Sequence, residues 1–242
     1  MERYIDGQGH IEMTPLYDVI IPSYQEDIDS LCSALNMTHR ELRITIIDNG
    51  NRDFGEQYGN QRVFPPKENI GFVKASNAGI AMSTAPYIVL MNDDTMIYNN
   101  VFDKMRLCFE KDPKLGIVGA ALSGRMQHDI DRAEQDAKDC EVNFRGELLY
   151  TGMVPFTCAM LKREVIEKCD YLDESFGVGY AEDDEYCYRV RQAGFKIGIA
   201  RDAYVLHRGS QTFKALYTPE QIIELKARNL EYYKKKWGLE TI

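Results

Sequence analysis

The feature that most constrains the fold is an apolar run, Tyr87 to Met91, that stops abruptly at polar residues. Asn92, Asp93 and Asp94 follow it directly. A short apolar run bounded by polar residues is typical of a buried strand, so these side chains are expected together at a strand end. Open α/β sheets bind ligands at strand ends, and paired oxygen ligands there suit a hard divalent cation. An acidic turn is the competing interpretation, and the remaining segments must decide between the two.

The segments around this run alternate between strand and helix patterns. Buried strands are predicted at residues 17–24, 42–50, 63–64, 87–91 and 116–121. Helices are predicted between them, at residues 27–35, 72–82 and 101–111. Because this alternation is typical of βαβ units, we expect an α/β fold with four or five parallel strands.

The second half of the chain carries less regular patterns. The charged stretch 123–149 is interpreted as an excursion over the sheet. Strands are expected at residues 156–161, 196–200 and 203–206, and helices at residues 163–168 and 182–194. Thr218 and Gln221 form a capping-box pattern around a proline at the first helical position, which predicts a last helix. We expect this helix to dock on the body through residues that share one face: Ile223, Leu230, Tyr233 and Trp237.

Composition excludes several classes of protein. The 242 residues include 44% hydrophobic ones, enough for a substantial core in a single domain. The formal charge of -9 and the pI near 5.1 argue against a nucleic-acid surface. Six cysteines occur without any C-x-x-C pair, so free thiols in a reducing cytosol are expected. No apolar stretch reaches the roughly 18 residues of a membrane span, so we expect a soluble cytoplasmic protein; peripheral contact of the basic, aromatic stretch 232–237 with a membrane stays open.

Polar residues end three of the predicted strands, at Ser23, Asp48 and Asn92. Since the carboxyl ends of parallel strands meet at one edge of a sheet, these side chains are expected to lie side by side, in a geometry that suits a nucleotide. Asp48 can accept from a base N–H or a ribose hydroxyl, or it can bond the backbone of Gly50 in a turn.

The helix expected after residues 69–71 begins near the same edge of the sheet. Its first backbone N–H groups can bind phosphate or a polar sugar, and a plain helix cap explains the same tripeptide. Lys74 and Asn77 are expected to point the same way one turn later.

Four consecutive acids, residues 182–185, begin another predicted helix. The macrodipole alone favours acids in a first turn. Crowded carboxylates also repel one another, which raises the proton affinity of some of them and suits Glu182 or Asp183 to work as a general base. His207 follows a strand and fits either a neutral imidazole ligand or a structural histidine.

The order of these segments resembles the family 2 glycosyltransferases, inverting enzymes of the GT-A fold, and especially the branch that includes bacterial rhamnosyltransferases. The matching segments span residues 17 to 207: 19–24, 47–50, 69–71, 75–79, 90–94, Glu182 and Asp183 with Cys187 and Arg189, and His207. The resemblance implies metal-dependent transfer of a sugar from a UDP, dTDP or GDP sugar to a hydroxyl of a glycan or lipid-linked acceptor, as in polysaccharide biosynthesis. Within one domain of residues 1–242, residues 17–121 would form the nucleotide-sugar-binding half, residues 122–215 the acceptor and catalytic half, and residues 218–238 the C-terminal helix.

The resemblance also assigns residues to roles. Base and ribose would be held by Pro22, Ser23, Tyr24 and Asp48, in a nucleotide-sugar site that further includes Glu26, Lys74, Asn77, Asn92 and Asp93. The acid-x-acid metal motif of the family falls on residues 92–94. Because Asn92 stands where many members have aspartate, Asp94 is the expected ligand of Mn²⁺ or Mg²⁺, and His207 matches a second ligand. Asp183 matches the catalytic base, with Glu182 beside it.

Two other functions use the same residue types. A sugar-phosphate nucleotidyltransferase also combines an α/β sheet with a metal and a nucleotide, but it carries a glycine-rich loop with Arg and Lys after the first strand, where this chain has residues 22–26 without glycine. A non-catalytic nucleotide-sugar or glycan-binding module would keep the fold without turnover. The presence of Asp94, Asp183 and His207 disfavours that module.

Overall fold

The computed structural model describes residues 3–5, 11–24, 28–39, 41–50, 61–66, 68–123, 127–209 and 216–239. Its helices and strands follow one another in the order β1 (Arg3–Ile5), β2 (Ile11–Met13), β3 (Tyr17–Ser23), α1 (Asp29–Thr38), β4 (Leu42–Asp48), β5 (Gln61–Phe64), α2 (Gly71–Met82), β6 (Tyr87–Met91), β7 (Thr95–Ile97), α3 (Val101–Lys111), β8 (Leu115–Ser123), α4 (Gln127–Asn143), β9 (Leu148–Thr151), β10 (Cys158–Lys162), α5 (Arg163–Cys169), a short 3-10 helix (Glu174–Phe176), α6 (Glu182–Gln192), β11 (Lys196–His207) and α8 (Pro219–Trp237).

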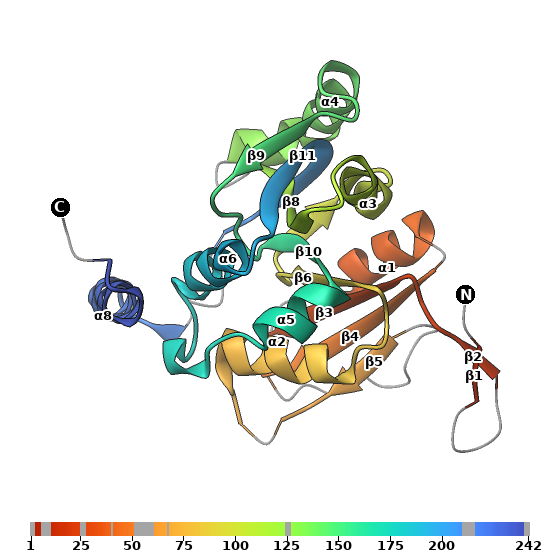
Figure 1. Ribbon diagram of the computed structural model, residues 1–242. Helices are drawn as coiled ribbons and strands as arrows, with labels where there is room; N and C mark the ends of the chain where they lie inside the picture. The colour runs from red at the N-terminus through yellow and green to blue at the C-terminus, as the bar shows by residue number, and fades with distance from the viewer. Residues whose placement is uncertain are drawn as a thin grey trace.

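One mixed sheet organises the described residues (Figure 1). Its strand order is β5-β4-β3-β6-β10-β8-β11-β7, and β9 pairs with β11. The strands β5, β4, β3 and β6 are parallel neighbours, as the sequence predicted, whereas β10 runs antiparallel between β6 and β8. Consequently β4, β3 and β6 end side by side at one edge, which brings their polar terminal residues together.

Helices cover both faces of this sheet. Alternate residues of β3 point to opposite sides: Val19 and Ile21 join a core beneath α1 and α3, and Ile20 joins a second core with residues of α2, α5 and α6. Every residue of β3 is buried. A strand that is covered on both faces needs apolar residues at consecutive positions and not at alternate ones. This continuous apolar run is why β3 could be predicted from the sequence.

The charged stretch 123–149, which the sequence analysis interpreted as an excursion over the sheet without assigning helices or strands, has regular structure. It contains α4 and the edge strand β9. Among the residues of α4 whose side chains the structure describes, Ala133 and Ala137 are buried, against Tyr204 and Leu206 of β11. The two strands expected at 196–200 and 203–206 are one strand, β11, with a register irregularity between Ala200 and Tyr204.

The last helix, α8, begins with the predicted capping box, since Thr218 and Gln221 exchange side-chain and backbone hydrogen bonds. Half of its predicted docking face contacts the body, because Tyr233 packs against the core and the indole N–H of Trp237 donates to Glu185. The other half does not. Ile223 is 67% exposed and Leu230 is 44% exposed, while the one buried residue of α8 is Asn229. The helix is oriented so that the polar side chain of Asn229 faces the body. The spacing of hydrophobic residues cannot predict this orientation.

The six cysteines are unpaired, and all except Cys140 are buried. No helix in the described ranges combines the length and apolar character that crossing a bilayer requires. The division of the chain into a nucleotide-sugar half, an acceptor half and a C-terminal helix stays a prediction.

Candidate active site

A cavity of about 410 Å³ opens at the carboxyl ends of β3 and β6, next to the beginning of α6 and the end of β11. Nine of the residues predicted from the sequence line it: Pro22, Ser23, Tyr24, Asn92, Asp93, Asp94, Glu182, Asp183 and His207. They come from segments as far apart as β3 and β11 in the chain. The fold therefore gathers both predicted halves of the site around one space.

Asp93 joins two of the strand ends. Its Oδ2 atom accepts hydrogen bonds from the Ser23 hydroxyl and from the backbone N–H of Tyr24, both at 2.9 Å. On the other side of β6, the backbone N–H of Asn92 donates to the carbonyl of Thr157 at 3.0 Å. Strand ends that the sequence predicted to be neighbours are thus connected directly.

Asp94 and His207 lie next to each other in the wall of the cavity. The Nε2 atom of His207 lies 3.0 Å from Oδ1 of Asp94 and 3.4 Å from the amide nitrogen of Asn92. Oδ1 of Asp94 is buried, and apart from this close contact with His207, which lacks hydrogen-bond geometry, no described residue bonds to it. A carboxylate oxygen and an imidazole nitrogen that converge in this way are suitable ligands for a divalent cation.

This pair fits Mn²⁺ or Mg²⁺ as part of a coordination shell. In the part of the chain that the structure describes, no cluster of three or more His, Cys, Asp or Glu side chains is arranged to hold a metal. Two protein ligands leave several positions for oxygen atoms of water or of a bound diphosphate, which is how Mg²⁺ is usually held beside phosphates.

Asp48 is placed differently from the expectation. It is 0% exposed, its Oδ1 atom accepts from the backbone N–H of Gly50 at 3.1 Å, and it is not among the residues that line the cavity. This hydrogen bond to the backbone of Gly50 is the second of the two roles that the sequence analysis considered for Asp48. The next residue, Asn49, lines the cavity instead, and its Oδ1 atom accepts from the backbone N–H of Ile70 at 3.2 Å.

The first two N–H groups of α2 are already bonded within the protein. The N–H of Gly71 donates to the Asn69 side chain at 2.9 Å, and the N–H of Phe72 donates to the carbonyl of Val178 at 3.2 Å. Gly71 has a φ of +77°, and a Cβ atom there would lie 2.8 Å from Cα of Val178. The glycine thus allows the loop around residue 178 to pack against α2.

Two further predicted residues, Lys74 and Asn77, are not among the residues that line the cavity. Lys74 is exposed on α2. Asn77 is buried, and its amide donates to the carbonyl of Leu172 at 2.9 Å and accepts from the N–H of the same residue at 3.0 Å. Asn77 therefore fixes the loop that leads toward α6. Glu26 lies outside the described residues.

The first residues of α6 carry carboxyl groups with perturbed proton affinity. Burial raises the pKa of Glu182, which is 8% exposed, and the neighbouring Asp183 raises it further. Burial also raises the pKa of Asp183, followed by the charge of Asp184. The sequence attributed this effect to repulsion among the acids, but desolvation is the larger cause.

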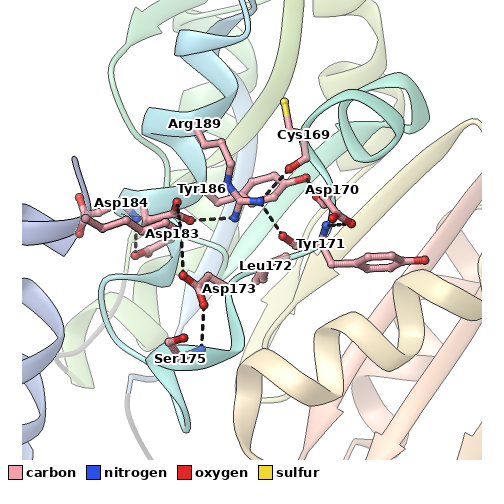
Figure 2. A network of polar contacts seen from close by, with 12 residues as sticks. Cys169, Asp170, Tyr171, Leu172, Asp173, Ser175, Asp183, Asp184, Tyr186 and Arg189 are labelled. Atoms are coloured by element: carbon pink, nitrogen blue, oxygen red, sulfur yellow. Dashed lines mark hydrogen bonds and ion pairs between the residues drawn. The ribbon is translucent and has the colours of Figure 1, made fainter. Parts of the chain in front are cut away.

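Glu185, the fourth acid of the run, does not belong to this group. It is fully buried on α6 and forms ion pairs with Arg189 and Lys236, each at 2.8 Å. Figure 2 shows Arg189 reaching from α6 toward the chain before the 3-10 helix, where it donates to the carbonyls of Cys169 and Tyr171. Glu185 thus anchors α6, while Glu182 and Asp183 line the cavity.

Several lining residues were not predicted, among them the aromatic side chains Phe156, Tyr180 and Tyr217. Aromatic residues outside a periodic pattern give no positional signal in a sequence. Gly177 and Gly179, which precede Tyr180, indicated only a loop.

Comparisons with known proteins bear on the family and the fold of the chain. The family model described as Glycosyl transferase family 2 matches residues 18–170, from β3 to α5, and ends before Glu182. An uncharacterized glycosyltransferase from Haemophilus influenzae is 23% identical over 254 residues, which cover 95% of this chain and 78% of that protein. The protein y4gI from Sinorhizobium fredii is 26% identical over 261 residues, and this chain spans only 28% of its length while 94% of this chain is covered.

A solved structure supports the fold independently of sequence. The mannosyltransferase from Pyrobaculum calidifontis, in complex with GDP-Man and Mn²⁺, superimposes with a TM-score of 0.62 at 17% identity. The match covers 95% of this chain and 66% of that chain. The α/β fold expected from the sequence, of the GT-A type, is confirmed.

Proposed function

The chain belongs to glycosyl transferase family 2, and on this premise we propose that it transfers a sugar from a nucleotide diphosphate to a hydroxyl of a glycan or lipid-linked acceptor, with inversion at the anomeric carbon. One observation carries the proposal: the pair Asp94 and His207 lines the same cavity as the carboxyl groups of Glu182 and Asp183. A donor that binds through its diphosphate and an acceptor that must lose a proton need these two groups of residues close to each other.

On the donor side, the proposed ligands of Mn²⁺ or Mg²⁺ are Asp94 and His207. The cation would supply Lewis-acid stabilisation of the leaving diphosphate. That the mannosyltransferase from Pyrobaculum calidifontis was crystallised with GDP-Man and Mn²⁺ supports this assignment. Asp93 holds Ser23 and Tyr24 in the wall of the cavity, where base and ribose would bind. UDP, dTDP and GDP sugars are all candidates.

On the acceptor side, Asp183 would act as the general base. Its pKa is raised by burial, which brings its proton affinity toward the range in which a carboxylate works as a base near neutral pH. The acceptor oxygen bonds to the anomeric carbon, its proton passes to the Asp183 carboxylate, and the bond to the diphosphate breaks. A single displacement of this kind inverts the anomeric configuration.

Glu182 contributes through its buried position. Burial and the charge of Asp183 raise the pKa of Glu182, so the two neighbouring carboxyl groups would share protons as a pair, and Asp183 would act as the base when its own carboxyl group is ionised. The aromatic residues Phe156, Tyr180 and Tyr217 give the cavity apolar surface against which the faces of sugar rings can pack.

The test is a calorimetric titration of UDP, dTDP and GDP into the protein with Mn²⁺ or Mg²⁺ present. We expect at least one nucleotide to bind only with metal, and Asp94→Asn to weaken that binding by about tenfold or more. Asp112→Asn is the matched control, because Asp112 pairs with Lys196 and is not among the residues that line the cavity. The absence of binding by all three nucleotides with either metal would contradict the proposal. Donor turnover separates an enzyme from a binding module.

A further inference from the structure

The turn that leads into Glu182 has an unusual backbone. Gly177 and Gly179 have φ values of 68° and 143°, and the two residues before Glu182, Tyr180 and Ala181, have φ values of 74° and 65°. Positive φ is unfavourable for residues that carry a Cβ atom. A segment with this conformation persists only when its surroundings hold it. Residues 177–181 are called the acid turn below, because they position the acids at the start of α6.

Asn229 of α8 is the side chain that holds the acid turn. It is 1% exposed, and its Nδ2 atom lies 2.9 Å from the carbonyl of Phe176, 2.8 Å from that of Gly179 and 2.9 Å from that of Tyr180. The two N–H bonds of the amide are therefore shared among three carbonyls. Its Oδ1 atom accepts from the guanidinium of Arg228 at 3.0 and 2.9 Å.

The rest of α8 contacts both sides of the acid turn. Before the turn, Oδ2 of Asp173 accepts from the hydroxyl of Tyr232 at 2.9 Å and pairs with Lys236 at 2.6 Å. After the turn, Oε1 of Glu185 lies 2.8 Å from Lys236 and accepts from the indole N–H of Trp237 at 3.2 Å. Figure 1 shows α8 at the edge of the molecule, beyond α6 and away from the sheet.

The orientation of α8 argues that this contact serves the turn. A helix that docks only for stability is expected to bury its apolar residues. Here Tyr232 and Tyr233 are only partly buried against the core and Ile223 and Leu230 are exposed, while Asn229 is the one residue of the helix that is fully buried. Lys226 adds a second contact to the turn, because its ammonium lies 4.5 Å from the centre of the Tyr180 ring.

We propose that Asn229 is a positioning residue for the transfer reaction: through its hydrogen bonds to the carbonyls of the acid turn, it fixes the placement of Glu182 and Asp183 in the cavity. This inference rests on the proposed function, in which Asp183 takes the proton of the acceptor. Asn229 itself is not among the residues that line the cavity. Its loss should therefore lower turnover and leave nucleotide binding, which involves β3 and β6, unchanged.

The experiment compares the 242-residue chain with its Asn229→Asp variant. This variant keeps the shape of the side chain and replaces the donor amide by an acceptor that faces three carbonyl oxygens. We expect amide hydrogens of residues 177–184 to exchange about tenfold faster. We also expect kcat for sugar transfer to fall about tenfold or more, while the Kd for a nucleotide diphosphate with Mn²⁺ changes less than about twofold. Asn229→Ser provides a second variant, with the same measurements, in case the aspartate variant does not fold.

A cavity-forming control separates positioning from general destabilisation. Met105 is fully buried in α3, on the opposite face of the sheet from α6. Met105→Ala should lower stability without changing exchange at residues 177–184.

Two results would overturn the inference: unchanged exchange in the acid turn of the Asn229 variants, or faster exchange with an unchanged kcat. If the wild-type protein neither binds a nucleotide diphosphate nor transfers a sugar, the proposed function fails. In that case the exchange measurement still decides whether Asn229 holds the turn.

Discussion

Replacing Glu182 by glutamine should stabilise the protein at alkaline pH and leave its stability unchanged at acidic pH. Glu182 is buried beside Asp183, and its Oε2 atom has no hydrogen-bond partner among the described residues. Burial favours the neutral form of the carboxyl group, so its pKa is raised in the folded protein. A glutamine has nearly the same shape and carries no charge at any pH.

The sign of the effect follows from the protons bound in each state. Below about pH 4, Glu182 is protonated in both the folded and the unfolded chain, so the variant gains nothing. As the pH rises, the unfolded chain releases this proton first, and the wild-type protein loses stability until the folded pKa is reached. The advantage of the variant therefore grows over that interval and stays constant above it. A pKa difference of one is worth about 1.4 kcal/mol.

We expect Glu182→Gln to gain about 2 kcal/mol in free energy of unfolding near pH 9, which raises the melting temperature by about 4 to 8 °C. Urea denaturation between about pH 4 and pH 9 measures this difference directly. The matched comparison is Glu185→Gln on the same helix. That substitution removes a buried charge that is paired with Arg189 and Lys236, so it should destabilise the protein by about 3 kcal/mol at neutral pH.

The test is whether the two substitutions change the free energy of unfolding in opposite directions. If Glu182→Gln were neutral or destabilising near pH 9, the claim that Glu182 is a desolvated carboxyl group would be wrong. A gain that did not depend on pH would point to packing instead of charge.

Two further predictions concern stability away from the cavity. Arg43→Ala leaves the buried carboxylate of Asp18 without its ion pair and should cost about 3 kcal/mol in urea denaturation. Burial alone would raise the pKa of Asp18, yet hydrogen bonds from Arg43 and Ser83 hold it below its ordinary value, so this stabilisation is present at neutral pH and is lost as the pH falls through the folded pKa. Thr218→Ala removes the capping box of α8; a loss of about 1 kcal/mol is expected, with faster exchange at the start of that helix.

The parts of the fold that could be predicted are those marked by a pattern within a single short stretch of sequence. An apolar run that ends in polar residues identified β6 with its bounds, and regular apolar spacing did the same for α3. Because parallel order follows from the βαβ alternation, the meeting of Ser23 and Asp93 could also be predicted.

Other elements could not be predicted because their packing depends on weak or distant signals. In α4 the buried contacts come from Ala133 and Ala137, and most other positions are polar or charged, so the stretch showed no apolar face. Asn77 was expected near the nucleotide, but it bonds the backbone of Leu172, 95 residues away. A polar side chain can form its hydrogen bonds with any backbone group that the fold brings close. The sequence alone therefore does not predict which backbone group that is.

The most direct measurement for the central claim compares donor binding and sugar transfer in Asp183→Asn. The substituted amide cannot accept the proton of the acceptor hydroxyl, while the residues assigned to nucleotide and metal remain. We expect metal-dependent nucleotide binding within about twofold of wild type and a kcat lower by about a hundredfold or more. Full transfer activity in this variant would contradict the assignment of Asp183 as the base that works opposite the Asp94 and His207 pair.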